Sequence, residues 1–399
     1  MYKLYCRTSQ LMFRVVAPIL PWRKPELLEG VGSLSRLPKL IADKDIHRVL
    51  IVTDQGITST GLMDSLLAGL QTAGVDCIVY DKTIPNPTIE NIEEALQLYH
   101  QSRCQGIIAF GGGSPLDCAK GLGARVARPD KSIPQMKGQL KVRKKLPPLF
   151  AVPTTAGTGS EATVAAVISN SETQEKYAIN DFSLIPHHAV LDPLLTLNLP
   201  PAITAATGMD ALTHAIESYI GKSSTAETRD CSRKAVKLVF ENLPEAYQNG
   251  QNISARDNMQ KAAYLAGVAF TRAYVGYVHA IAHTLGGFYS FPHGQANAII
   301  LPYVLEYYGD RIHKELAELA EAAGIASEGL SIKENAFRFI EEIKKLNKTL
   351  SIPDKIPCIA DCDIPTMVER AFQEANPLYP VPKILDKNDL FQLYHLIKA

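Results

Sequence analysis

Short apolar runs separated by helical segments characterise the first half of the chain, and this pattern constrains its fold most. Residues 49–53, 75–80 and 106–110 are each long enough for one buried strand. Residues 62–73 and 88–102, which lie between them, have the spacing of amphipathic helices. Strands joined by such helices run parallel, and the helices cover the sheet. The pattern therefore predicts an α/β domain built on a Rossmann-like parallel sheet.

Two further strands and a hairpin are expected before residue 200. Residues 149–152 and 189–191 repeat the pattern of a short buried strand. Residues 163–169 and 176–180 are two short strand-like runs joined by Asn-Ser-Glu, which predicts a β-hairpin.

Helical patterns dominate the chain beyond Pro200 and Pro201, where strand-like runs almost vanish. The expected helices cover residues 202–219, 225–241, 255–270, 278–289 and 311–323. A chain of 399 residues is long enough for two hydrophobic cores. We therefore predict an α/β domain over residues 1–200, which includes an apolar N-terminal segment, and an all-α domain over residues 201–399.

Composition and charge argue against nucleic acid and membranes as partners. Lys and Arg together number 41, as do Asp and Glu, so the net charge gives no indication of nucleic-acid binding. Lys3, Arg7 and Arg14 interrupt the N-terminal apolar segment and leave no run of transmembrane length, so we expect no membrane association. We expect this segment to pack on the body of the protein or on a partner subunit. The seven cysteines are scattered and odd in number, which favours a cytoplasmic location over a disulfide framework.

Two pairs of polar residues with helical spacing make the second half chemically distinctive. Asp210 and His214 are four residues apart, as are His279 and His283, and residues at this spacing share one face of a helix. His293 follows in the sequence Pro-His-Gly. One carboxylate with several imidazoles suits a divalent ion such as Zn²⁺ or Fe²⁺. Spacing alone also allows exposed pairs or hydrogen-bonded core contacts, so both interpretations stay open at this point.

A glycine-rich turn follows the third expected strand. Residues 111–113 are three glycines, and Ser114 and Pro115 are residue types that favour the N-cap and the first turn of a helix. Asp117 lies where a capping-box acid would. A helix N-terminus behind a glycine turn presents free N–H groups to an anion. A structural turn and a pyrophosphate-binding loop are both compatible with this sequence.

A second polar loop, residues 153–161, follows the strand at 149–152. It contains Thr154, Thr155 and Thr158 together with two glycines. In a parallel sheet, ligands bind outside the carboxyl ends of the strands. The hydroxyl groups of this loop are therefore candidates to line the phosphates and the nicotinamide of a dinucleotide.

Taken together, these motifs resemble those of the iron-containing (group III) alcohol dehydrogenase family over nearly the whole chain. GGGSPLD at 111–117 is similar to the family's GGGSxxD, and PTTAGTGSE at 153–161 matches its threonine loop. GMDALTH at 208–214 and the histidine motifs from 279 to 294 resemble its metal-binding signature. The resemblance implies a dehydroquinate synthase-like architecture, in which the α/β domain binds the dinucleotide and the helical domain binds the metal and carries catalysis.

The resemblance also implies roles for individual residues. Asp210, His214, His279 and His293 would hold the metal, whereas His283 would lie near the substrate and relay a proton. Asp54 would contact the adenosine ribose, and Asn86 would lie near the adenine. The other cofactor-binding residues would be Gly112, Gly113, Ser114, Asp117, Thr154, Thr155, Thr158 and Lys176.

The function implied is a metal-dependent, NAD(P)-linked alcohol dehydrogenase. It would transfer a hydride between nicotinamide and a small or medium primary alcohol or its aldehyde, with Fe²⁺ or Zn²⁺ as the ion. A carboxylate at Asp54 would favour NAD, because it accepts a hydrogen bond from the ribose 2′-hydroxyl and repels a 2′-phosphate. The resemblance further implies a homodimer or a higher homo-oligomer.

Several alternatives remain open on the sequence. The related dehydroquinate synthases and maleylacetate reductases use the same scaffold, and a non-catalytic nucleotide-binding relative would keep the motifs without turnover. Arg272 follows Phe270 and precedes the motif at His279, so it could bind the carboxylate of a hydroxy acid or semialdehyde. It could instead pair with an acid on the surface or at a subunit contact. The aromatic residues expected to line the approach to the metal are Tyr264, Phe270, Tyr274 and Tyr277.

Overall fold

The computed structural model describes residues 1–17, 20–173 and 175–399, and the chain divides into two compact units. One unit is Pro21–Asn198, and the other combines Met1–Leu20 with Leu199–Ala399. The division between the units, at Asn198 and Leu199, therefore lies close to the boundary expected at residue 200. The N-terminal segment, however, belongs to the helical unit and not to the α/β unit, to which we had assigned it.

Specific contacts hold the N-terminal helix α1 (Tyr2–Val16) on the helical unit. Arg7 donates hydrogen bonds to the carbonyl oxygens of Val381 and Pro382, and the Tyr2 ring stacks on Phe372 with the centroids 5.3 Å apart. An apolar helical pattern shows that one face will be covered. It does not show which surface, more than 350 residues away in the chain, will cover it.

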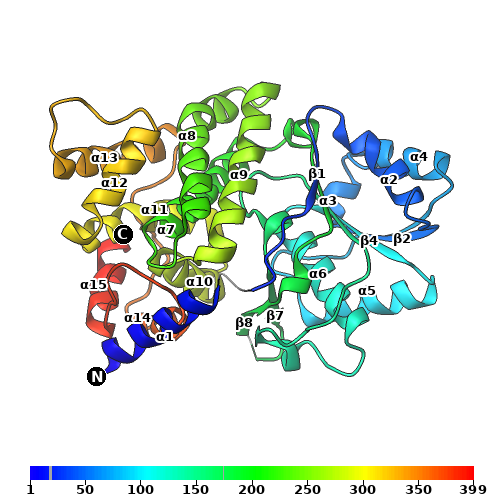
Figure 1. The fold of residues 1–399 in the computed structure, drawn as a ribbon, viewed down its shortest axis with the longest axis horizontal. Helices are drawn as coiled ribbons and strands as arrows, with labels where there is room; N and C mark the ends of the chain where they lie inside the picture. The colour runs from blue at the N-terminus through cyan, green and yellow to red at the C-terminus, as the bar shows by residue number, and fades with distance from the viewer. Residues whose placement is uncertain (18–19, 174) are drawn as a thin grey trace. The chain divides into compact units, whose positions relative to one another are not determined.

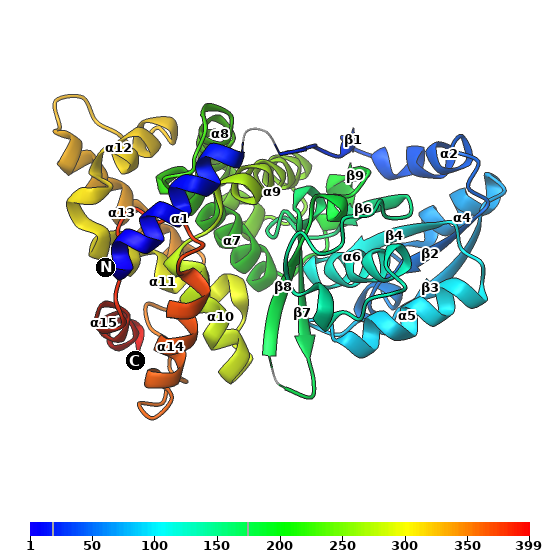
Figure 2. The ribbon, with the colours of Figure 1, turned by 60° about the horizontal axis from the view of Figure 1, so that its bottom comes forward.

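Six parallel strands form the main sheet of the α/β unit (Figure 2). They are β1 (Glu26–Glu29), β2 (Arg48–Val52), β3 (Asp76–Tyr80), β4 (Gly106–Gly111), β6 (Leu149–Pro153) and β9 (His188–Leu191). Their order across the sheet is β1-β9-β6-β4-β2-β3, and every neighbouring pair is parallel. The predicted fold class is confirmed. The edge strand β1 was not predicted.

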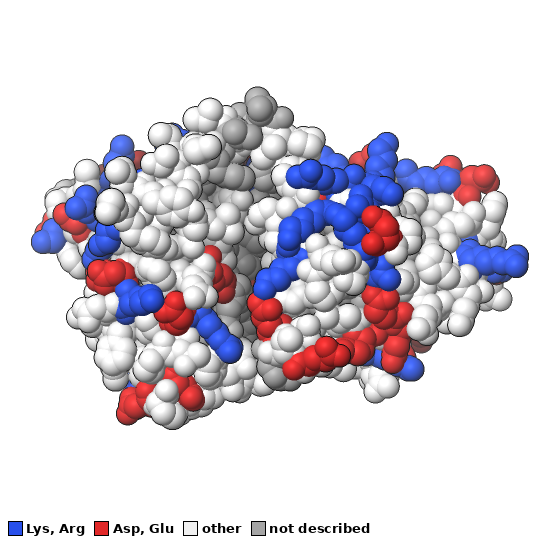
Figure 3. Space-filling model, turned by 90° about the horizontal axis from the view of Figure 1, so that it is seen from below, with Lys and Arg blue, Asp and Glu red and all other residues white. Residues whose placement is uncertain are grey.

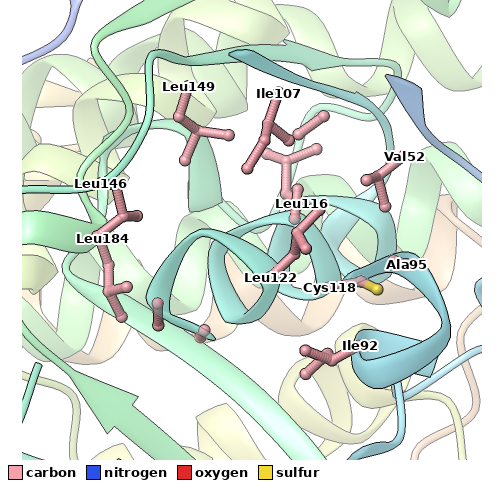
Figure 4. Packing of buried hydrophobic residues seen from close by; sticks show 14 of the residues in the cluster. Val52, Ile92, Ala95, Ile107, Leu116, Cys118, Leu122, Leu146, Leu149 and Leu184 are labelled. Carbon is pink, nitrogen blue, oxygen red and sulfur yellow. The ribbon is translucent and has the colours of Figure 1, made fainter. Parts of the chain in front are cut away.

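Alternate residues of the central strands pack on opposite faces of the sheet. Val49 and Ile51 pack with helices α2 (Leu37–Ala42) and α4 (Asp64–Thr72). Leu50, Val52 and Ile107 pack instead with α5 (Ile89–Gln101) and α6 (Gly113–Ala127), whose buried side chains include Ile92, Leu116 and Leu122 (Figure 4). Side chains alternate along a strand, so continuous apolar strands require helices on both faces.

A small second sheet completes the α/β unit. Strands β7 (Ala165–Asn170) and β8 (Glu175–Asn180) form an antiparallel hairpin, as predicted, and β5 (Gly138–Gln139) pairs in parallel with β8. Ser169 lies opposite Lys176 in the hairpin.

Helices make up the regular structure described in the other unit (Figure 1). After α1 they are α7 (Pro201–Ile220), α8 (Ala226–Gln248), α9 (Ile253–Ala273), α10 (Tyr277–Tyr289), α11 (His293–Tyr308), α12 (His313–Ala322), α13 (Ile332–Thr349), α14 (Ile364–Ala375) and α15 (Lys387–Ile397). Helices α7, α8 and α9 pack together. The expected helices between residues 202 and 323 are confirmed, but α11 was missed because Pro302 lies inside it.

The surface carries charges of both signs, in line with the balanced composition. On the face drawn in Figure 3, a dense group of basic side chains is bordered by acidic ones. No helix among the described residues is both long enough and apolar enough to cross a membrane.

The buried carboxylate of Asp192, just after β9, is hydrogen-bonded to the loop that follows the edge strand β1. Asp192 is 2% exposed and accepts hydrogen bonds from the backbone N–H groups of Gly32, Leu34 and Leu194. Asp192→Ala leaves these donors without their acceptor, so we expect a loss of about 3 kcal/mol in the free energy of unfolding. Urea unfolding followed by the fluorescence of Trp22, the only tryptophan, measures this for the α/β unit.

The exposed Asp64 provides the matched control. Asp64→Ala removes an acid from the first turn of α4 and should cost less than about 1 kcal/mol. Equal losses in the two variants would contradict the role given to Asp192.

Candidate metal centre and nucleotide-binding loops

Three helices of the helical unit bring Asp210, His279 and His293 together. One potential ligand atom of each residue lies within 4.8 Å of the others. Asp210 Oδ1 is 3.7 Å from His279 Nε2 and 3.5 Å from His293 Nε2. Asp210 and His279 are buried, whereas the side chain of His293 is 34% exposed. These three residues form what we call the metal cluster.

Close packing at Gly294 places His293 beside Asp210. A Cβ atom at Gly294 would lie 2.1 Å from the carbonyl oxygen of Ala206, one turn before Asp210 on α7. Backbone cannot yield to such a contact, so only glycine lets the start of α11 meet α7. The glycine of the Pro-His-Gly motif is therefore part of the construction of the cluster.

His214 lies beside the metal cluster. Its Nδ1 is 4.0 Å from Asp210 Oδ2. Its ring stacks on Phe270 and on His279, with centroid separations of 4.0 and 4.4 Å. Of the four predicted ligands, three thus have converging donor atoms and the fourth is packed against them.

Glu217 is a functional candidate that our sequence analysis missed. It is 3% exposed, and its Oε2 lies 2.7 Å from His279 Nδ1. The backbone N–H groups of Gly276 and Val278 donate to the same carboxylate at 2.8 Å. A carboxylate on Nδ1 fixes the ring so that Nε2 points toward the cluster, as is usual for metal-binding histidines. Glu217 follows Asp210 by two helical turns, and this spacing is the signal that could have revealed it.

Asn297 is a second residue that we missed, although it belongs to a motif we used. It is fully buried, one turn after His293. Its Nδ2 donates to Asp210 Oδ1 at 2.7 Å and lies 3.2 Å from both His279 Nε2 and His293 Nε2. The three donor atoms of the cluster therefore all face one electropositive N–H group.

The electrostatics of the cluster favour positive charge. Burial alone would raise the pKa of Asp210, but the nearby rings of His214, His293 and His279 outweigh it and lower this pKa. Burial alone would lower the pKa of His279, but the nearby carboxylates of Asp210 and Glu217, the latter hydrogen-bonded to Nδ1, raise it to about 9. Protons and metal ions compete for such groups. Imidazole and carboxylate donors in this setting fit a divalent ion such as Fe²⁺ or Zn²⁺.

His283 has a different partner from the cluster residues. Its Nδ1 is 2.6 Å from Glu374 Oε1, which also accepts a hydrogen bond from the Tyr379 hydroxyl at 2.8 Å. The His283 ring stacks on His293 with the centroids 5.1 Å apart. The side chain is 27% exposed, so the ring lies beside His293 of the cluster and is partly open to solvent.

In the α/β unit, the glycine turn packs against the threonine loop. Strands β4 and β6 pair so that Gly111 lies beside Pro153, and Thr154 N donates to Gly111 O at 3.0 Å. A Cβ atom at Gly113 would lie 2.9 Å from Thr158 Cγ2, and one at Gly112 would lie 3.3 Å from Thr155 Cγ2. The two predicted loops therefore form one continuous surface at the carboxyl ends of these strands.

We had expected Ser114 to be the N-cap of α6, but the N-cap is Gly112. Among the described residues, no side chain caps this helix, so its first N–H groups are left free at the glycine turn. Ser114 lies in the first turn, and its Oγ accepts a hydrogen bond from Asn86 N at 3.2 Å. Lys176 Nζ donates to Asn86 Oδ1 at 2.7 Å. Three predicted cofactor residues from separate segments thus meet beside the helix N-terminus.

Asp117 does not cap α6, because it lies beyond the first turn and turns toward the hairpin. Its carboxylate accepts hydrogen bonds from Ser160 Oγ at 2.9 Å and Val167 N at 3.1 Å. Nearby, the fully buried Lys120 donates to Thr163 and Ala165. Asp117 therefore joins the threonine loop to β7, and its contact with the cofactor stays a prediction.

Asp54 lies at the carboxyl end of β2, where it caps a short helix, α3 (Gln55–Thr58). Its Oδ1 accepts a hydrogen bond from Ile57 N at 3.0 Å. The residue is partly exposed, so a carboxylate is present at the strand end that the nucleotide hypothesis requires.

Arg272 pairs with an acid, which is one of the two roles that the sequence left open, and Tyr277 lies in the core. Arg272 Nη1 is 2.5 Å from Glu227 Oε2, so the guanidinium pairs with an acid on α8. Tyr277 is fully buried, and its hydroxyl donates to Asn376 and Leu385 in the core. Phe270 does reach the cluster, through its contact with the His214 ring.

Comparison with known proteins finds matches over most of the chain. Residues 25–193 match the iron-containing alcohol dehydrogenase family, and residues 204–397 match the C-terminal region of the Fe-containing alcohol dehydrogenase family. The 1,3-propanediol dehydrogenase of Citrobacter freundii is 38% identical over 372 residues, covering 92% of this chain and 94% of that protein. Alcohol dehydrogenase 4 of Saccharomyces cerevisiae (strain YJM789) is 41% identical over 326 residues, covering 81% and 84%.

Solved structures extend the comparison to the fold. A 1,3-propanediol oxidoreductase structure superposes with a TM-score of 0.91 at 36% identity, covering 94% of this chain and 98% of that chain. The sulfoacetaldehyde reductase of Bifidobacterium kashiwanohense in complex with NAD⁺ gives a TM-score of 0.85 at 28% identity, covering 95% and 98%. The chain belongs to the iron-containing alcohol dehydrogenase family. It is an NAD-dependent alcohol oxidoreductase that uses a divalent metal ion.

The position of Glu217 leads to a prediction about metal binding. Glu217→Gln keeps the size of the side chain but weakens its hold on His279 Nδ1. We expect the affinity for Fe²⁺ or Zn²⁺ to fall roughly 10- to 100-fold, because partners of metal-binding histidines contribute at this level. Equilibrium titration against a chelator of known affinity measures the change.

Glu241→Gln, which alters an exposed acid on α8, is the control and should bind the ion like the unmodified protein. Circular dichroism shows whether both variants keep their helices. An unchanged affinity in a well-folded Glu217→Gln protein would rule out the orienting role.

Proposed function

We propose that this enzyme interconverts a small or medium primary alcohol and its aldehyde at an ion held by Asp210, His214, His279 and His293. The convergence of Asp210, His279 and His293 donor atoms is the observation that supports the proposal most directly. A bound divalent ion supplies Lewis-acid polarisation of an alcohol or carbonyl oxygen. We propose Fe²⁺ as the ion, in keeping with the family, although three imidazoles and one carboxylate also suit Zn²⁺.

The protein groups around the ligands have distinct tasks in this proposal. Glu217 accepts the hydrogen bond of His279 Nδ1–H and so directs the Nε2 lone pair toward the ion. Asn297 holds Asp210 Oδ1 by its hydrogen bond. Phe270 covers the His214 ring and keeps water away from one side of it. These contacts fix the ligands before the ion or the substrate arrives.

We propose that His283 moves the proton of the reaction. Glu374 accepts a hydrogen bond from His283 Nδ1, which sets the tautomer and leaves Nε2 as the site that gains or loses a proton. The partial exposure of the ring allows that proton to pass to water. His283 is therefore assigned to proton transfer and not to metal binding.

The loops of the α/β unit bind NAD in this proposal, and NAD supplies the hydride acceptor. The uncapped N-terminus of α6 suits the pyrophosphate, because its N–H groups and helix dipole favour an anion. Thr154, Thr155 and Thr158 line the adjoining loop. Asn86 and Lys176 form the polar group beside them. Asp117 acts behind this surface by holding the threonine loop in place.

A small alcohol is the substrate class that these observations favour. The hydroxy-acid alternative depended on an available Arg272, and Glu227 pairs with that guanidinium. Relatives named for 1,3-propanediol and methanol support a short substrate.

A homo-oligomer remains a prediction. A cytoplasmic location is also a prediction, which the seven free cysteines support.

Two histidine variants test the assignment of roles. His279→Ala should lose both the bound ion and turnover. His283→Ala should keep the ion, because its Nδ1 is held by Glu374, yet lose roughly 100-fold in kcat/KM, a typical contribution of general acid–base catalysis. Metal content by elemental analysis and NADH formation from 1,3-propanediol and short primary alcohols measure the two properties.

His313→Ala, which replaces a histidine on α12, serves as the control. Two results would be decisive against the scheme. One is turnover in a metal-free His279→Ala protein, which would remove the metal from the reaction. The other is equal metal loss in His283→Ala and His279→Ala, which would make His283 a ligand.

Cofactor preference is tested at Asp54. Asp54→Asn keeps an oxygen that can cap α3 but removes the negative charge, whereas Asp54→Gly removes both. We expect the unmodified enzyme to prefer NAD. Both variants should use NADP at least about 10-fold better relative to NAD, because repulsion of the 2′-phosphate is relieved. The ratio of kcat/KM values for the two cofactors is the measurement, and an NADP preference in the unmodified enzyme would contradict the role of Asp54.

A further inference from the structure

A pocket of about 380 Å³ lies in the helical unit, apart from the metal cluster. Its lining residues are Lys3, Arg7, Lys222, Arg311, Pro382, Lys383 and Ile384. Five of these are Lys or Arg and none is acidic. None of them belongs to the metal cluster or to the nucleotide loops. We call this the basic pocket, and its volume is within the range of small-molecule sites, about 300–1,000 Å³.

The wall of the basic pocket is held in place by hydrogen bonds. Arg7 Nη1 and Nη2 donate to the carbonyl oxygens of Val381 and Pro382 at 2.7 and 2.9 Å, and Arg7 also bonds Gln10. These bonds fix α1 against the segment that carries Lys383. The backbone N–H of Lys222, just beyond the end of α7, donates to Pro380 O of the same segment at 2.6 Å. The cations are therefore gathered on a formed surface.

Acidic groups balance these cations only in part. Lys3 is 3.8 Å from Asp386 and Arg311 is 3.8 Å from Asp310, and both pairs are exposed and loose. Lys383 Nζ lies over the Tyr307 ring, 4.7 Å from its centroid. Exposed ion pairs at such distances contribute little free energy, so Asp386 and Asp310 neutralise Lys3 and Arg311 only weakly.

Lys222 is the least compensated of the five. Within the described part of the chain, its ammonium group has no hydrogen bond or ion pair. Burial and the charges of Arg7 and Arg311 lower the pKa of Lys222, with Glu315 opposing them. Repulsion among gathered cations is a cost that a bound anion removes.

We propose that the basic pocket binds the phosphate groups of a small organic bisphosphate. Phosphate oxygens accept charge-assisted hydrogen bonds from ammonium and guanidinium groups. Lys222, Arg311 and Lys383 provide the donors, whereas the carbonyl-bound Arg7 shapes the wall and adds charge. The cations come from four segments, namely α1, the end of α7, and the regions around residues 311 and 383. A ligand with two phosphate groups can accept hydrogen bonds from several of these segments at once.

Calorimetric titration with fructose 1,6-bisphosphate tests the proposal on the full-length, metal-loaded enzyme. Saturating NAD is present throughout so that the nucleotide loops are already filled. We expect one bound ligand per chain. Lys222→Ala and Arg311→Ala should each weaken binding at least about 10-fold, since each removes a charged hydrogen-bond donor. Lys348→Ala, an exposed lysine on α13, is the matched control and should bind like the unmodified enzyme.

A lipid headgroup is a second source of the same phosphate chemistry, because α1 exposes Leu4 and Leu11 at 72% and 59%. Co-sedimentation with phosphatidylcholine vesicles, with and without phosphatidylglycerol, separates the two sources. Binding to the anionic vesicles alone, lost in Lys222→Ala and Arg311→Ala, would identify a lipid phosphate as the ligand of the pocket. Absence of binding in both assays, or binding that both substitutions leave unchanged, would overturn the proposal. Unchanged circular dichroism spectra exclude misfolding of the variants.

Discussion

The hydrogen bond between the buried carboxylate of Glu217 and His279 Nδ1 is the contact on which the metal cluster depends. Glu217 also accepts from the backbone of Gly276 and Val278, so one side chain fixes both the start of α10 and the orientation of its first histidine. Burying this carboxylate without these three donors would be costly. With them, the carboxylates of Glu217 and Asp210 lie on opposite sides of one imidazole, and this arrangement stabilises positive charge at the cluster.

Close approach of backbones is the second requirement, and it is met by glycine in both units. Gly294 lets the start of α11 contact Ala206 on α7, which brings His293 to Asp210. Gly113 allows the first turn of α6 to contact Thr158. In each case a methyl group would enter the space of its neighbour. The glycines therefore set the distance between elements, whereas neighbouring side chains supply the chemistry.

The buried charged residues Lys120 and Asp117 of the α/β unit hold segments of the chain together. Lys120 is 1% exposed, and burial lowers its pKa to about 8 even though the nearby carboxylates of Asp117 and Glu161 raise it. Its three hydrogen bonds to Thr163 and Ala165 hold the beginning of β7. Asp117 completes the connection through Ser160 and Val167. The threonine loop is thus supported from behind, which leaves its outer surface for a ligand.

Local residue patterns by themselves determined the parallel sheet and the helical second half, and they singled out Asp210, His214, His279 and His283 as one carboxylate with imidazoles at helical spacing. Apolar runs at residues 49–53 and the four-residue spacing of Asp210 and His214 are properties of neighbouring residues, and periodicity expresses them directly. Tertiary structure alone decided that α1 packs on the helical unit, that Glu217 and Asn297 support the cluster, that Asp117 faces the hairpin, and that Glu227 pairs with Arg272. Each of these is a contact between segments distant in the chain. Such contacts depend on which surfaces meet after folding, and no local pattern of residues encodes them.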